Sequence, residues 1–467
     1  MLLARGRILS AEEVSYSVRL RSMYAHGDEN ATDWSTPAVA VTMPPESPER
    51  ANVHTQPEAA SSSDEVASLK VSKQRTLEPE PSRGRSSRVR DSSILRTASE
   101  VAGGMEDYSE VSGRHVDRYG FIRPSPIAEQ EDAGRTAGAI KRREWSREEK
   151  WRKMAVLRSS GRGRRGTGDR TTITGGGMAF SFDTNDSLVV SRTWKGVPDR
   201  WRATAWHGFL SASAKKRGGE SDDILLDQFH QLQEQNCADD VQIDVDVPRS
   251  INMHVMFRKR YRGGQRLLFR VLHAIALKFP DIGYVQGMAS LATTLLCYFE
   301  EAMAFVMMVR LWELRGLKEL FCHGFDGLMA ALAEFDKEWL GQGEVAQKLE
   351  ELGISGTAYG TRWYLTLFNM SIPFPAQLRI WDVFMLLGDK DDVGSDGPGS
   401  FGGASMDVLH AASAALIDAT RDILLDSDFE NAMKTLTSWI PVKDEDLLMR
   451  VAKAEWTAKK RRMKKAH

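Results

Sequence analysis

The sequence is poor in cysteine and has no long apolar run. Its 467 residues contain three cysteines, Cys237, Cys297 and Cys322, without the even number of a disulfide framework or the close spacing of metal ligands. The longest apolar stretches, such as residues 287–299, fall short of the roughly 20 residues of a membrane-spanning helix. The first residues, MLLARGRILSAEE, hold too short an apolar run for a secretory signal. We therefore expect a soluble, cytoplasmic protein without disulfides.

A large net charge and a phosphate-binding loop are also missing. The 63 Lys and Arg residues and the 64 Asp and Glu residues nearly cancel, which argues against binding of nucleic acid through overall charge. A GxxxxGK[ST] loop, whose backbone would hold nucleotide phosphates, is absent. The acidic, Gly-rich segment 388–405 does not fit the ligand pattern of an EF-hand. We expect no cofactor and no metal of the chain's own, and we interpret 388–405 as a mobile surface loop.

The first 187 residues differ in composition from the rest. Residues 44–187 are rich in Ser, Arg, Glu and Gly and have few large apolar residues, which predicts disorder. Within them, residues 140–157 predict a short basic helix, which we interpret as solvated, with contact to a membrane surface or a partner as the alternative. Residues 14–43 alternate apolar and polar residues around a Gly/Asp/Asn turn, so we expect residues 1–43 to hold a hairpin fragment or to be disordered.

From residue 188 onward, apolar residues recur at helical spacing. This pattern predicts an all-α domain of many helices over residues 188–440. The clearest helix is 263–279, where seven apolar residues form one core-facing stripe. The other expected helices are 199–210, 222–235, 287–299, 302–316, 325–341, 343–352, 357–370, 375–387, 406–425 and 428–438. Residues 441–467 predict a basic tail, either a frayed solvated helix or a segment attracted to anionic lipid.

Two polar side chains stand out in loops of this helical half. Arg249 ends the run IDVDVPR, and Gln286 lies in GYVQG. A guanidinium can neutralise charge on a phosphate, and a carboxamide can align a water molecule. We expect residues 251–262 to form a helix that pairs with 263–279, so that the chain leaves Arg249 and returns beside it at Gln286. Without this return, a helix of about 25 Å would separate the two side chains.

Three ordered motifs contain these residues. The motifs are Arg192-x-Trp194-x-Gly196-Val-Pro198-x-x-x-Arg202-x-x-x-Trp206, then Ile243-x-x-Asp246-x-x-Arg249, then Tyr284-x-Gln286-Gly287. In this order they resemble the signature motifs of the TBC-domain GTPase-activating proteins that act on Rab GTPases. Two further patterns, Tyr359-x-x-x-Trp363 and Leu378-Arg-Ile-Trp381-Asp382, resemble later helices of that family. Ordered motifs are more specific than any single one.

The resemblance implies a protein that accelerates GTP hydrolysis by a GTP-bound Rab, on endomembranes and in vesicle traffic. Arg249 would neutralise charge on the transferred phosphoryl group, and Gln286 would position the attacking water. GTP and Mg²⁺ would belong to the partner, and the chain itself would have no independent hydrolase site. Supporting roles fall to Asp246, Tyr284 and Gly287, which would hold the arginine loop, pack under the glutamine loop with the hydroxyl on buried backbone, and allow close approach of the partner. The remaining motif residues, Trp194, Gly196, Pro198, Arg202 and Trp206, are expected to be structural, as are Trp381 and Asp382.

Less specific interpretations remain open. Arg249 can simply pair with a nearby carboxylate, and Gln286 can hydrogen-bond the adjacent backbone. The chain would then be a Rab-binding scaffold that does not accelerate hydrolysis. Binding of RNA by the Arg-rich residues 140–170 is a more distant alternative. The presence of both side chains favours the activator, because a scaffold needs neither.

Overall fold

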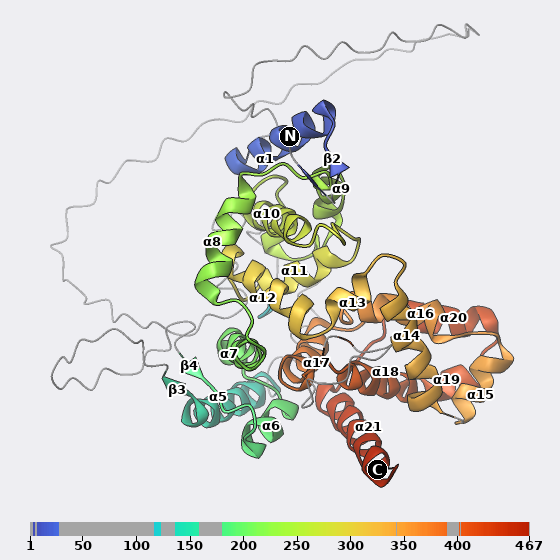
Figure 1. Cartoon of the computed structure of the whole chain (residues 1–467). Helices are drawn as coiled ribbons and strands as arrows, with labels where there is room; N and C mark the ends of the chain where they lie inside the picture. The colour runs from blue at the N-terminus through green and yellow to red at the C-terminus, as the bar shows by residue number, and fades with distance from the viewer. Residues whose placement is uncertain are drawn as a thin grey trace, which may run out of the picture. The chain divides into compact units, whose positions relative to one another are not determined.

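The structure of this chain is a computed structural model (Figure 1). It describes residues 3–4, 7–27, 116–122, 136–157, 180–341, 343–389, 401 and 403–466. Within these ranges the fold is α-helical, as the sequence predicts. The strands are two residues long and form two antiparallel pairs, β1 (Leu3–Ala4) with β2 (Arg7–Ile8) and β3 (Val156–Leu157) with β4 (Phe180–Ser181).

The helices follow one another with short connections. They are α1 (Ala11–His26), α5 (Thr136–Met154), α6 (Ser187–Trp194), α7 (Asp199–Arg217), α8 (Asp222–Gln233), α9 (Asp240–Asp246), α10 (Gly263–Lys278), α11 (Met288–Leu296), α12 (Glu301–Leu314), α13 (Leu317–Phe321), α14 (Asp326–Glu334), α15 (Glu344–Glu351), α16 (Gly356–Leu365), α17 (Phe374–Leu387), α18 (Asp407–Ala419), α19 (Arg421–Leu425), α20 (Phe429–Thr437) and α21 (Glu445–Ala466). Two 3₁₀ turns, η2 (Val247–Arg249) and η3 (Val255–Phe257), and one π-helical stretch, η4 (Phe335–Leu340), complete the chain. The helices expected from residue 199 to 250 and from 263 to 438 are thus present, with ends shifted by a few residues.

Helix α10 shows how the sequence pattern places an element. Its apolar stripe lies in the core, and Leu268, Val271, Leu272 and Ile275 have no exposed surface. The helix packs against α8, α11 and α12, as Figure 1 shows. Burial of each such aliphatic side chain contributes about 1.5–3 kcal/mol, which offsets the entropy lost in ordering the chain.

A buried carboxylate on α17 joins the first motif to the core. Asp382 has no exposed surface and accepts hydrogen bonds from Arg202 Nε at 2.9 Å and from Trp206 Nε1 at 2.9 Å. It also accepts from the backbone N–H of Val197 at 3.0 Å, in the turn that precedes α7. Arg202 donates its remaining charge-assisted bond to Asp199 at 2.6 Å. A buried charge is stable only when its bonding capacity is filled, so these residues depend on one another.

The prediction of a hairpin at 14–43 is wrong for its first half. Residues 11–26 form α1, whose start is fixed by a capping box between Ser10 and Glu13 and whose end is fixed by Gly27 in the left-handed region. Tyr24 on this helix stacks on Phe269 of α10, with ring centroids 4.0 Å apart. The local capping signals therefore outweigh the alternation of apolar and polar residues. Residues 28–43 lie outside the described part of the chain.

The prediction of a basic helix at 140–157 is confirmed, but its interpretation as solvated is wrong. Trp151 of α5 is 1% exposed and packs edge-on against Phe182, 5.3 Å between centroids. Glu144 of the same helix accepts a hydrogen bond from the backbone N–H of Asp199 at 2.7 Å. The boundary expected at residue 188 is therefore too late, because 116–122, 136–157 and 180–187 pack with the helical body. The rest of 44–187 lies outside the described residues.

The C-terminal segment is also more than a solvated tail. Helix α21 packs along α18 and α17 and buries Leu448, Met449 and Ala452. Near its end, Lys459 pairs with Glu338 and lies over the ring of Trp339. The helical domain thus continues past the boundary expected at residue 440.

The acidic loop expected at 388–405 is described only at its two ends, because residues 390–400 and 402 are outside the described part. Asp389 there pairs with Arg217 and accepts from Ser213 at 2.7 Å. No helix among the described residues has the length and apolar character needed to cross a membrane.

Candidate functional site

The arginine loop begins where α9 ends. Asp246, the last residue of α9, is 3% exposed, and the chain then turns through η2. Pro248 in this turn has a fixed φ that suits a helical first turn. The side chain of Arg249 is 56% exposed and donates through Nη2 to Oδ1 of Asp246. The hydroxyl of Ser250 donates to the Asp246 carbonyl at 2.8 Å, so it performs the capping expected of it.

The path from this loop to α10 is not the helix expected at 251–262. The segment bends and contains the turn η3, with positive φ at Ile251 and Tyr261. The backbone N–H of Val255 donates to the Gly120 carbonyl at 2.9 Å, and His254 contacts the Tyr119 carbonyl through Nε2 at 2.7 Å. Residues 116–122 therefore supply hydrogen bonds from far away in the sequence. Such partners compete with a local helix, and the sequence pattern did not reveal them.

The glutamine loop lies between α10 and α11 and is fixed from below by Tyr284. This tyrosine is 5% exposed, and its hydroxyl donates to Oδ2 of Asp246 at 2.6 Å. Its backbone N–H donates to Asp239 at 2.8 Å. Burial, together with the bond to Asp246, raises the pKa of Tyr284 far above its ordinary value, so the hydroxyl remains a donor. The expectation that this hydroxyl would bond buried backbone is wrong, because the carboxylate is its partner.

The end of the glutamine loop is open. Gln286 is exposed, and within the described part of the chain its side chain has no hydrogen-bond partner. Gly287 has φ +110, which L side chains rarely adopt, and forms the N-cap of α11. A Cβ at Gly287 would lie 3.8 Å from Leu365, so the backbone conformation and not crowding requires glycine here.

One carboxylate therefore connects the two loops. The two oxygens of Asp246 accept from Arg249 on one loop and from Tyr284 on the other. The close return of the chain expected from the sequence is present, although by a different path. The connection leaves the guanidinium of Arg249 and the carboxamide of Gln286 exposed, while the residues between them are buried.

The first motif lies elsewhere and is structural in character. Trp206 has no exposed surface, Trp194 is 4% exposed and Arg202 is 3% exposed. Gly196 has φ +100, and a Cβ there would come within 2.5 Å of Arg379 Nε. Pro198 is the N-cap of α7.

Known proteins share this arrangement of helices and motifs. A TBC domain-containing protein of Schizosaccharomyces pombe is 42% identical over 317 residues, which are 68% of this chain and 69% of the relative. The chain belongs to the TBC-domain family. The family model of the Rab-GTPase-TBC domain matches residues 199–393.

More distant relatives share a smaller part of their length with this TBC protein. The Rab GTPase-activating protein tbc-11 of Caenorhabditis elegans is 28% identical over 251 residues, 53% of this chain and 24% of tbc-11. The crystal structure of a Chlamydomonas flagellar RabGAP TBC domain has a TM-score of 0.50 at 21% identity, with 72% of this chain and 99% of that chain covered. This last likeness concerns the fold alone.

Helix α1 of this TBC protein is a supporting element that the sequence pattern did not reveal. Ser17 donates to Asp240 at 2.6 Å, and Tyr24 donates to Asp244 at 2.8 Å, so α1 holds both ends of α9. Asp240 also contacts His273 Nδ1 at 2.7 Å, and Cys237 lies beside them. The three buried side chains of Cys237, Asp240 and His273 have the atoms of a metal site, but hydrogen bonds from Ser17 and His273 already occupy the carboxylate. We interpret the group as a polar clamp between α1, α9 and α10.

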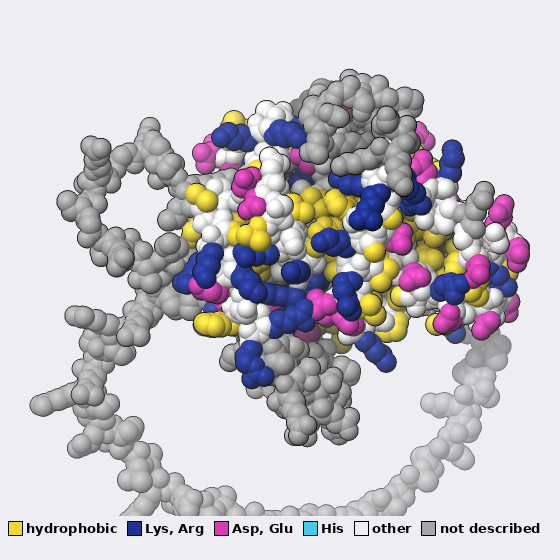
Figure 2. Space-filling model, turned by 90° about the horizontal axis from the view of Figure 1, so that it is seen from below, with side chains coloured by type: hydrophobic (Ala, Val, Ile, Leu, Met, Phe, Trp, Pro, Cys, Tyr) yellow, Lys and Arg dark blue, Asp and Glu magenta, His cyan; other side chains and the backbone are white. Residues whose placement is uncertain are grey.

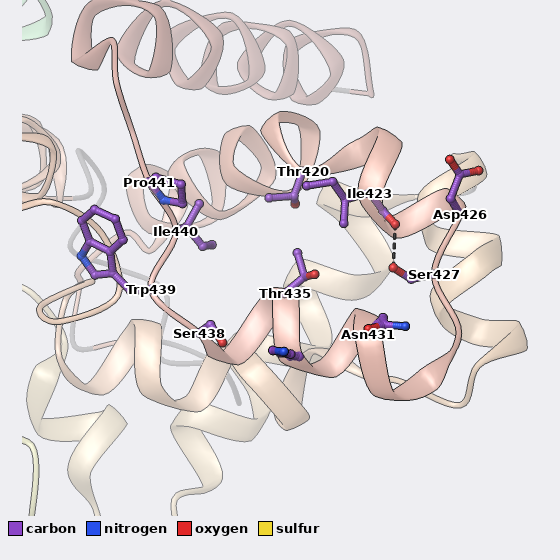
Figure 3. A pocket seen from close by; sticks show the side chains of 11 residues that line it. Thr420, Ile423, Asp426, Ser427, Asn431, Thr435, Ser438, Trp439, Ile440 and Pro441 are labelled. Carbon is purple, nitrogen blue, oxygen red and sulfur yellow. Dashed lines mark hydrogen bonds between the residues drawn. The ribbon is translucent and has the colours of Figure 1, made fainter.

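A separate hollow lies between α19 and α20. It has a volume of about 590 Å³ and is lined mostly by small polar side chains, with Trp439 at one end (Figure 3). Ser427 in its wall donates to the Ile423 carbonyl at 2.6 Å. The hollow shares no residue with the arginine and glutamine loops, and its lining contains no constellation for catalysis.

Proposed function

We propose that this TBC protein accelerates GTP hydrolysis by a Rab-type GTPase, with Arg249 and Gln286 supplied in trans. The observation that carries the proposal is the shared carboxylate: Asp246 ties the arginine loop to Tyr284 of the glutamine loop while both polar ends stay exposed. Family membership supports it, and relatives such as tbc-11 carry the activity in their names.

The two side chains have complementary chemistry. Negative charge spreads over the transferred phosphoryl group during hydrolysis, and a trans arginine lowers the barrier by an amount worth roughly 10³ to 10⁵ in rate. The Gln286 carboxamide can donate to or accept from the attacking water, which fixes its direction of approach. GTP and Mg²⁺ would be carried by the GTP-bound partner. A role in vesicle traffic at endomembranes follows from the same proposal.

Phosphate release from a panel of GTP-loaded Rab proteins tests the proposal. Arg249→Lys keeps the positive charge but loses the planar fork, so we expect the acceleration to fall to near the intrinsic rate. Gln286→Ala should lower it as well. Arg421→Lys is the matched control, because Arg421 is also an exposed arginine paired with a carboxylate, Glu344, on another helix.

The rival function is a scaffold that binds a Rab without accelerating hydrolysis. It predicts Rab binding by the wild type with no increase in phosphate release. If Arg249→Lys accelerates hydrolysis as fast as the wild type, the arginine assignment is wrong.

A further inference from the structure

The face of the molecule formed by α5, α6 and α21 carries a cleft rich in positive charge. Figure 2 shows Lys and Arg side chains gathered across the middle of this side, which is the lower side of Figure 1. The cleft has a volume of about 910 Å³, within the range of small-molecule sites. Eight basic and two acidic side chains line it, so the excess is six positive charges.

The charges come from four separate helices. Helix α5 supplies Arg143, Arg147 and Lys150, α21 supplies Arg450 and Lys453, and the remaining cations belong to α6, its C-cap and α17. Segments more than 250 residues apart in the sequence therefore meet at one concave surface. Separately, the basic helix and the basic tail were each best explained as solvated chain, and only their packing creates the cleft.

The protein neutralises this surface incompletely. Asp446 is shared by three arginines, Arg143, Arg147 and Arg379. The other carboxylate, Asp444, caps α21 through the backbone N–H groups of residues 446 and 447. Among the described residues, Lys150, Lys195, Arg450 and Lys453 have no ion-pair partner. Like charges held together in this way cost free energy until an anion joins them.

Two buried donors in the cleft wall also lack acceptors. Arg379 is 7% exposed and Trp194 is 4% exposed, and neither Arg379 Nε nor Trp194 Nε1 has a hydrogen-bond partner within the described part of the chain. Burial lowers the pKa of Arg379 to about 10, and the charge of Arg147 lowers it further. An unsatisfied buried donor is costly, so each is unusual in a folded protein.

We propose that this cleft binds a compact anion bearing several phosphate groups, of the inositol polyphosphate type, either free or as the headgroup of a membrane lipid. Phosphate oxygens accept bonds from arginine and lysine and fit both unsatisfied donors. The enclosed volume suits a single compact ring better than an extended acidic peptide. The site is separate from the arginine and glutamine loops, which lie on α9, α10 and α11, and so it goes beyond the proposed activation of a GTPase.

Binding of the full-length chain to two probes tests the site. The probes are free inositol hexakisphosphate, measured by calorimetry, and phosphatidylcholine vesicles containing phosphatidylinositol bisphosphate, measured by flotation. Vesicles matched in charge with phosphatidylserine measure attraction by charge alone. Binding to both phosphate probes, or to either one, supports the site, and the pattern identifies the source as free or lipid-borne.

The variants then locate the binding. Lys195→Ala with Arg450→Ala removes two exposed cations of the cleft, and we expect about 5-fold weaker binding for each, about 30-fold for the pair. The control, Lys216→Ala with Lys434→Ala, removes the same charge from exposed positions on α7 and α20 and should change binding little. Asp446→Asn removes a competing carboxylate and should strengthen binding.

Three results would overturn the proposal. The first is an equal loss in the cleft and control variants, and the second is binding of phosphatidylserine vesicles as strong as that of the bisphosphate vesicles. The third is binding of an acidic peptide at the cleft with no affinity for either phosphate probe. The circular dichroism melting curve of each variant should match that of the wild type, and the opposite direction expected for Asp446→Asn distinguishes a lost ligand from a damaged fold.

Discussion

The hydroxyl of Tyr284 offers the sharpest test of how the two loops are coupled. Tyr284→Phe removes the donor at 2.6 Å from Asp246 and changes nothing else in the ring. A hydrogen bond to a charged group contributes about 1.5–3 kcal/mol, so the free energy of unfolding should fall by that amount. The midpoint of urea unfolding, followed by tryptophan fluorescence, should shift with no change in slope.

Tyr359 provides a matched control within the same chain. It is 2% exposed, and its hydroxyl has no hydrogen-bond partner among the described residues. Tyr359→Phe removes a buried hydroxyl of the same kind without breaking a bond, so we expect no loss of stability or a small gain. The difference between the two variants isolates the bond between Tyr284 and Asp246.

The same pair of variants connects stability to function. If the whole bond energy serves to position Arg249, Tyr284→Phe should lower the acceleration of GTP hydrolysis by at most roughly 10- to 160-fold. Tyr359→Phe should leave it unchanged. Equal behaviour of the two variants in both unfolding and phosphate release would show that Asp246 does not couple the loops, and would refute the reasoning.

Two further predictions concern buried groups that support the fold. Asp382→Asn breaks the buried pair with Arg202, and we expect a loss of about 3–5 kcal/mol in urea unfolding, whereas Glu344→Gln, at the exposed pair with Arg421, should cost no more than about 1 kcal/mol. A loss below 1 kcal/mol for Asp382→Asn would contradict its central role. Burial lowers the pKa of His254 to about 4, so below pH 6.5 the unfolded chain binds a proton that the folded chain does not, and stability should fall by about 2 kcal/mol between pH 7 and pH 5. The variant His254→Gln should show a shallower pH dependence over this window, and an identical slope would mean that His254 is not the group responsible.

The positions of most helices could be predicted from the sequence, because the signals are local. The apolar stripe of α10 repeats every three to four residues, and Pro198 marks the start of α7. The candidate residues Arg249 and Gln286 were also found in this way, since their motifs lie within a few residues of each one. Such features need no knowledge of what lies across the fold.

Signals of this kind failed where a distant partner decided the conformation. Residues 251–262 have a helical composition, but residues 116–122 supply the hydrogen bonds that hold them in a turn. Helix α5 looked soluble from its charge, yet a single residue, Trp151, anchors it in the core. A charged helix with one apolar contact gives too weak a periodic pattern to indicate burial.

The sequence by itself determined the helical class, the family and the two exposed polar side chains, because each depends on residue types at short spacing. Only the tertiary structure decided which groups share Asp246 and Asp382, and that α5, α6 and α21 enclose one basic cleft. A carboxylate can pair with any donor that the fold brings within about 3 Å, and distance in space is not encoded in spacing along the chain. The pairing of buried charges and the meeting of remote basic helices are therefore properties of the folded chain.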